Sequence, residues 1–187
     1  SLSTHTLHRT PAQPHMTRPP LLQRCLRELR HLWLDAADAR RLLPPEAQAR
    51  LEAAVQASEA RHLGELRLCV EAGLPWGALR QGLDARGRAL ELFSALRVWD
   101  TAHNNGVLIY LLLADQRIEV IADRGVSIHV PPDTWQALAD RLGEALRQGQ
   151  PEPGLLAAIE QVGTLLRQHP QPMQVAPEGA DFLHVHG

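Results

Sequence analysis

The sequence predicts an α/β fold: a small mixed β-sheet, made of a βαβ unit plus an antiparallel hairpin, covered by helices on both faces. Three observations support it. Residues 65–71 alternate apolar and polar side chains, as a half-buried strand does. Residues 107–113 are continuously apolar, which is typical of a strand buried on both faces. Apolar residues between them recur at helical spacing, so the two strands should be parallel with a right-handed crossover.

A third strand should follow the second directly. Asp115 and Gln116 turn the chain, and the next apolar alternation ends at Asp123. A tight turn places this strand antiparallel to the second. We expect eight strand side chains to be buried: Leu66, Leu68, Val70, Val107, Ile109, Leu111, Ile118 and Val120.

Two helices are expected to flank the first strand. One begins at Pro44-Pro45 and ends near His62, before a glycine. The crossover helix should span about 84–99, with an inward stripe of Leu90, Phe93, Leu96 and Trp99. Glycine and proline make 73–82 a loop, in which we expect Trp76 to cover the edge of the core.

The C-terminal part should be helical after the sheet. Residues 126–130 are expected to form a short fourth strand or an extended lead-in. Helices should then span 131–149 and about 154–169, each started or ended by proline or glycine. The α/β domain therefore covers residues 44–170.

The two ends of the chain differ from the domain in composition. Residues 1–19, rich in Pro, Thr and His, and residues 171–187 are expected to be disordered tails. Residues 20–35 carry apolar side chains at helical spacing and should form an amphipathic helix. This helix could pack on the domain, contact an unidentified protein partner or lie on a membrane surface.

Composition excludes several classes of function. The formal net charge of −2 and the scattered arginines give no basic field for nucleic acid. The longest apolar run, 107–114, is far short of the roughly twenty residues that a membrane span needs. Nucleotide-binding and CxxC motifs are absent from the sequence, so we expect neither a nucleotide nor a redox cofactor. Two cysteines imply no disulfide framework, and we expect a cytoplasmic location.

Two blocks of sequence form a recognisable pattern. The first combines Leu92-Phe93 with the run Asn105-Gly106-Val107-Leu108, and the second is Ala122-Asp123-Arg124-Gly125. Together they resemble the TPM domain family. Ser58-Glu59, Glu65, Asp115 with Arg117, Trp135 and Gly154-Leu155 also fit, over roughly residues 44–170. The chain is most similar to the short bacterial branch without signal peptide or membrane anchor.

The resemblance implies an α/β sandwich and two kinds of function. The favoured one is a non-catalytic binding or assembly module, able to bind a cation and serving the maintenance of a membrane-protein complex. The alternative is a metal-dependent acid phosphatase that acts on phosphate esters, because some TPM proteins have been proposed to be phosphatases and some to bind calcium.

The predicted topology brings seven residues to one rim of the sheet. This rim contains the start of the first strand, the lead into the second and the end of the third. The expected metal ligands are Glu65, Asp100, Asn105 and Asp123, with the two aspartates as the main carboxylates, and the expected ligand-binding residues are His103, Asn104 and Arg124. Oxygen donors of this kind suit calcium or magnesium. The same residues could instead satisfy loop backbone groups or pair with each other.

Overall fold

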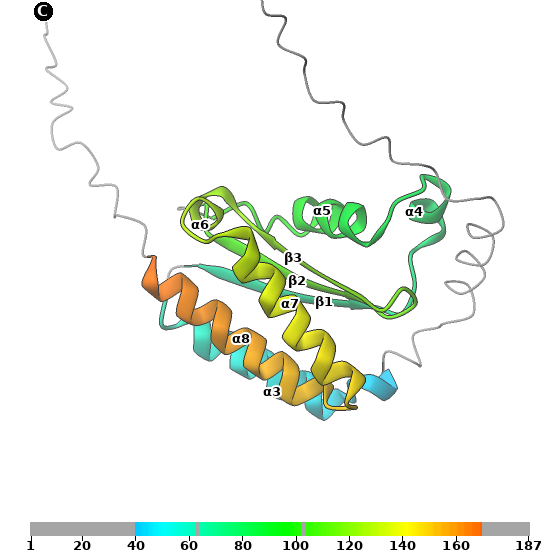
Figure 1. The fold of residues 1–187 in the computed structure, drawn as a ribbon, viewed down its shortest axis with the longest axis horizontal. Helices are drawn as coiled ribbons and strands as arrows, with labels where there is room; N and C mark the ends of the chain where they lie inside the picture. The colour runs from blue at the N-terminus through cyan, green and yellow to red at the C-terminus, as the bar shows by residue number, and fades with distance from the viewer. Residues whose placement is uncertain (1–39, 63, 102–103, 170–187) are drawn as a thin grey trace, which may run out of the picture.

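The computed structural model describes residues 40–62, 64–101 and 104–169 (Figure 1). The expected tails, 1–19 and 171–187, and the expected amphipathic helix, 20–35, lie outside the described residues. The elements follow in the order α3 (Pro45–Glu59), β1 (Glu65–Glu71), α4 (Trp76–Arg80), α5 (Ala85–Ala95), β2 (Gly106–Leu112), β3 (Arg117–Ala122), α6 (Arg124–Ser127), α7 (Pro132–Arg147) and α8 (Pro151–Gln168).

The sheet has the predicted topology. Its strands lie in the order β1-β2-β3, with β1 parallel and β3 antiparallel to β2. The register pairs Glu65 with Gly106 and Val107 with Ala122. The start of β1, the start of β2 and the end of β3 therefore share one edge of the sheet, as the sequence predicted.

Burial follows the position of each strand in the sheet. Every residue of the central strand β2 is buried, as expected for a continuous apolar run. Leu66 and Val120 are also buried, but Leu68, Val70 and Ile118 are only partly buried, so the prediction was wrong for these three. They lie on the outer strands, β1 and β3, which have a neighbouring strand on one side only.

Helices cover both faces of the sheet, as predicted (Figure 1). On one face, α3, α7 and α8 enclose the larger core cluster, which includes Val107, Ile109 and Leu111 from β2. The face toward α4 and α5 holds a smaller cluster that includes Leu108, Tyr110 and Leu112. The alternation of β2 side chains between the two faces thus builds both cores.

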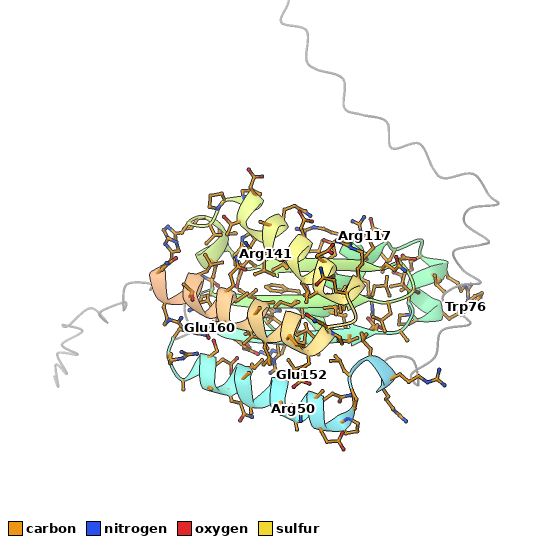
Figure 2. The ribbon with its side chains drawn as sticks, turned by 60° about the horizontal axis from the view of Figure 1, so that its bottom comes forward. Arg50, Trp76, Arg117, Arg141, Glu152 and Glu160 are labelled. Atoms are coloured by element: carbon orange, nitrogen blue, oxygen red, sulfur yellow. The ribbon has the colours of Figure 1, made fainter. Side chains whose placement is uncertain are left out.

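The helices α3 and α8 lie close together on the larger face. A Cβ atom added to Gly163 of α8 would overlap Ser58 Oγ of α3, so glycine permits this approach. Figure 2 shows Arg50 and Glu152 pointing toward one another between the same two helices, and they form an ion pair. α8 begins at Pro151, three residues before the predicted start.

The α4 and α5 layer corrects two predictions. The window expected to be a loop contains the short helix α4, and Trp76 at its start is 56% exposed and projects from the domain (Figure 2), so it does not cover the core edge. α5 ends at Ala95, and Arg97 then adopts a φ of 55°. The predicted inward stripe was wrong for Leu90, Leu96 and Trp99, which are exposed. α5 instead turns Ala85 and Ala89 to the core, and the left-handed Arg97 ends its helical period before Trp99.

The segment after β3 is helical. α6 occupies 124–127 and turns follow to 130, so the fourth strand or extended lead-in predicted at 126–130 was wrong. The reason is the cap: Asp123 Oδ1 accepts a hydrogen bond from the backbone N–H of Arg124 at 2.7 Å and starts the turn. Among the helices that the structure describes, none has the length and hydropathy needed to cross a bilayer.

Candidate functional site

Backbone hydrogen bonds hold together the end of the sheet that contains the start of β1, the start of β2 and the end of β3. We call this end the rim. Asp123 N donates to Gly106 O at 2.8 Å, and Gly125 N donates to Asn104 O at 2.7 Å. Asn104 has a φ of 52°, a left-handed conformation that asparagine tolerates. The loop before β2 is therefore attached to the turn after β3, as the topology predicted.

Gly106 is required at this edge for a steric reason. A Cβ atom there would overlap the backbone carbonyl of Val98, the residue that closes the loop after α5. Glycine lets this loop pack directly against the start of β2. The backbone N–H of Asn105 also donates to Thr101 Oγ1 at 3.0 Å. The main chain around Asn105 is thus fixed from both sides.

Two oxygens at the rim are buried without a hydrogen-bond donor. Asn105 is 7% exposed, and its Oδ1 has no partner among the described residues. Asp123 uses Oδ1 to cap α6, whereas its Oδ2 is buried and equally without a partner there. Leaving a buried acceptor unsatisfied costs about 1–3 kcal/mol, so such oxygens call for an explanation.

The other predicted site residues are placed differently. Glu65 forms an ion pair with Arg67 at 2.7 Å, and Asp100 pairs with Arg97. Arg124 is exposed, and His103 lies outside the described residues. Within residues 40–62, 64–101 and 104–169, no three His, Cys, Asp or Glu side chains gather as a metal-binding group. The described residues of the rim therefore do not assemble three carboxylates. Its unpartnered oxygens are Asn105 Oδ1 and Asp123 Oδ2.

A groove of about 950 Å³ lies between α3 and the outer strand β1, and sequence reasoning missed it. It extends from Leu43 near the start of α3 to His62 and Gly64 beyond its end. Leu68 and Val70 contribute apolar side chains from β1. These two residues are only partly buried because they line the groove. The sequence contains only a weak signal for the groove, because apolar and polar residues alternate in the same way whether or not an edge strand is covered.

His62 closes one end of this groove as a neutral ring. Its Nδ1 accepts a hydrogen bond from Gly64 N at 3.1 Å, and its Nε2 lies 3.2 Å from Ser58 Oγ. Nδ1 must therefore be unprotonated, so that Nε2–H can donate to Ser58. Burial lowers the pKa of His62 below its usual value, and this effect outweighs the nearby Glu59 carboxylate.

The carboxyl-terminal end of the β1–β2 pair carries a paired charge network. Arg88 of α5 contacts Glu71 with two nitrogens, at 2.8 and 3.2 Å, and also contacts Glu91 at 2.7 Å. The Arg88 and Glu71 side chains are each 18% exposed. Hydrogen bonding to Glu71 raises the pKa of Arg88 despite its burial. The Arg88–Glu91 spacing of three residues was the signal that the sequence offered.

Two further groups lie beside this network on the same face of the sheet. Burial, and secondarily the Glu71 carboxylate, raises the pKa of the Cys69 thiol to about 11 and raises the pKa of Tyr110 as well. Both side chains therefore stay protonated at neutral pH. A thiol that remains protonated is a poor nucleophile, so Cys69 is not activated for attack at neutral pH.

Comparisons with known proteins agree with the fold. The model of the TPM domain family matches residues 36–165. The BA42 protein from the psychrophilic bacterium Bizionia argentinensis, solved by NMR, is 26% identical, with a TM-score of 0.60 over 73% of this chain and 90% of that chain. No curated protein matches the chain.

Two solution structures show the same fold at lower identity. The N-terminal domain of a protein from P. gingivalis is 20% identical, with a TM-score of 0.55 over 68% of this chain and 78% of that one. The N-terminal domain of the cg2496 protein from Corynebacterium glutamicum is 13% identical, with a TM-score of 0.50 over 78% and 84%. Since the family model covers most of the chain and the sheet has the topology its motifs predicted, this chain belongs to the TPM domain family.

Proposed function

We propose that this protein is a non-catalytic binding module whose rim holds a divalent cation, calcium or magnesium. The observation that carries the proposal is the pair of buried, unpartnered oxygens, Asn105 Oδ1 and Asp123 Oδ2. One comes from an amide and the other from a carboxylate, and hard cations prefer both kinds of oxygen.

The surroundings of these oxygens support a ligand at this position. Asp123 cannot turn away without losing its cap on α6, and the main chain of Asn105 is fixed by its bond to Thr101. Both acceptors lie at the same end of the sheet, and a cation would satisfy them where no donor of the described residues does. Calcium takes six to eight oxygens, so carbonyl groups, water or a partner protein would complete the coordination.

A module of this kind would act through assembly. A cation that the rim coordinates incompletely leaves positions for oxygens of a second protein, which suits a role in maintaining a membrane-protein complex. We place this role in the cytoplasm, where Cys69 stays reduced. The phosphatase alternative would use the same cation to polarise a phosphoryl oxygen, with Arg124 contacting the phosphate.

The test is the melting temperature of the full chain with and without millimolar calcium or magnesium. Binding to the folded state raises it according to RT ln(1 + [L]/Kd). We expect a rise in the wild type and its loss in Asp123→Asn, which keeps an oxygen for the α6 cap. Asp100→Asn is the matched control, because Asp100 already pairs with Arg97 and should leave the rise intact.

Three results would change the proposal. An unchanged wild-type melting curve would remove the cation. Equal loss of the rise in both variants would return Asp100 to the site, as the sequence predicted. Metal-dependent hydrolysis of p-nitrophenyl phosphate that Asp123→Asn abolishes would replace the binding module with the enzyme.

A further inference from the structure

The groove between α3 and β1 lies along an open edge of the sheet. Glu71 O accepts from Leu113 N, so Glu71 and alternate residues before it face β2. The intervening residues face away, and Leu66 N accordingly donates to Glu59 Oε1 at 2.8 Å rather than to a strand. The backbone groups of Leu68 and Val70 have the same orientation, toward the groove. In the described part of the chain, no strand pairs with this edge.

Native proteins commonly cover such an edge with a helix or loop, because exposed strand edges pair with other chains. The groove volume, about 950 Å³, is at the upper end of ligand pockets, which measure about 300–1,000 Å³. Its walls mix leucine and valine side chains with charged ones along the whole length of α3. This shape fits an elongated segment better than an ion or a small molecule.

We propose that residues 20–35 of this same chain dock into the α3–β1 groove as its covering helix. Their apolar stripe consists of Leu22, Cys25, Leu26, Leu29, Leu32 and Trp33. Residues at these spacings share one face of a helix and require an apolar surface to cover them.

Chain length places the segment at the groove. Arg40 lines the groove, and only residues 36–39 separate it from the segment, a reach of about 14 Å when extended. Sixteen residues of helix measure about 24 Å, and the fifteen residues of α3 measure about 22 Å. A helix that runs antiparallel to α3 from this connection would therefore cover the groove from end to end.

Charge is also complementary. The groove walls carry three glutamates, Glu52, Glu59 and Glu65, against two arginines. Residues 20–35 carry three arginines, Arg24, Arg27 and Arg30, against two acidic residues. In the proposed helix Arg30 flanks the apolar stripe, whereas Arg24 and Arg27 lie on the other face. The complementarity is therefore one of overall charge between the segment and the groove walls.

The native Cys25 allows a direct test in the full chain. It lies ten residues before Asp35, and Val55 lies ten residues after Pro45, so antiparallel docking brings the two together. In a Cys69→Ser background, Val55→Cys should form an intramolecular disulfide with Cys25 on mild oxidation. Ala53→Cys, exposed and directed away from the groove, is the matched control. We expect the Val55→Cys variant to crosslink at least about tenfold faster than the control.

Any other crosslinking result would overturn the proposal. Equal rates for the two variants would mean random collision, and disulfide-linked dimers would mean that a second copy fills the groove. Failure to crosslink in a natively folded variant would leave the groove to another partner. If Val55→Cys does not fold, hydrogen exchange of the full chain decides: Leu29→Asp should speed exchange at residues 66–70, whereas Arg27→Asp, on the other helix face, should not.

Discussion

The two ends of the parallel β1–β2 pair treat their polar groups in opposite ways. At the carboxyl-terminal end, Glu71 and Arg88 bind each other in a fork and are mostly buried. At the amino-terminal end, Asn105 Oδ1 and Asp123 Oδ2 are buried without a donor. Open α/β sheets usually bind ligands beyond the carboxyl ends of their strands. Here the two unpartnered acceptors lie at the other end, and the unpartnered Tyr110 hydroxyl beside Glu71 can itself donate a proton. The difference between the ends is therefore in their oxygen acceptors, and this difference guides the choice of candidate site.

The largest effect should come from breaking the paired end. Arg88→Met leaves the Glu71 carboxylate partly buried without its cation, and we expect a loss of about 2–3 kcal/mol in the free energy of unfolding. Urea denaturation measures it. Arg117→Met, which removes an exposed arginine from Glu119, should cost under about 0.5 kcal/mol.

The double variant Glu71→Leu, Arg88→Met sharpens this result. Replacing both charges with apolar side chains removes the uncompensated carboxylate, so most of the lost stability should return. If the double variant is as unstable as Arg88→Met alone, the packing of the arginine stem, and not its charge, holds this end together.

A smaller effect should appear at the amino-terminal end as the pH falls. Burial lowers the pKa of folded His62 below the ordinary 6.5, so the unfolded chain binds more protons between the folded and the unfolded pKa. His62 therefore contributes its full stability above about pH 6.5, and that contribution declines as the pH drops toward the folded pKa.

Urea denaturation at several values between about pH 5 and pH 7 measures this slope, above the range in which carboxylates titrate. His62→Gln, which keeps polar groups near Ser58 and Gly64, should flatten it. A slope unchanged in His62→Gln would mean that another histidine causes the dependence.

The smallest effect on stability should come from the unpaired end itself. Without divalent cations, Asn105→Ala removes a buried acceptor that has no donor, which stabilises the fold, but it also loses the packing of the buried amide. The two contributions oppose one another, so the free energy of unfolding should change by less than about 1 kcal/mol in either direction. A loss of several kcal/mol in the presence of EDTA would show that Asn105 Oδ1 is satisfied in solution. The contrast between the two ends of the sheet would then disappear.

The sheet could be predicted because its signals are periodic. Alternation in β1, the apolar run of β2 and the tight turn before β3 determine direction and order, and so bring Asn105 and Asp123 to one edge. Predictions failed where single residues decide the structure. The left-handed Arg97 ends the period of α5, and the Asp123 cap turns an expected strand into α6.

The candidate site was predictable in place but not in composition. Topology brings Glu65 and Asp123 to the same rim, yet whether a carboxylate is free depends on its side-chain neighbours. Glu65 finds Arg67 two residues away and Asp100 finds Arg97 three residues away. In a chain with 19 positive residues, choosing among such partners requires the actual distances. The groove was hidden for a related reason, because it depends on how far α3 lies from β1.

The order of the strands has a consequence for how the protein folds. Residues 113–116 connect β2 to β3, whereas β1 meets β2 only after the chain has closed over 72–105. Closing the shorter loop costs less entropy, so the β2–β3 hairpin should form first and β1 should join it late. Asn105 and Asp123 directly flank the two strands of the early hairpin, while the groove needs β1. The two proposed sites would therefore mature one after the other, and a newly made chain could acquire its cation before residues 20–35 have a surface to cover.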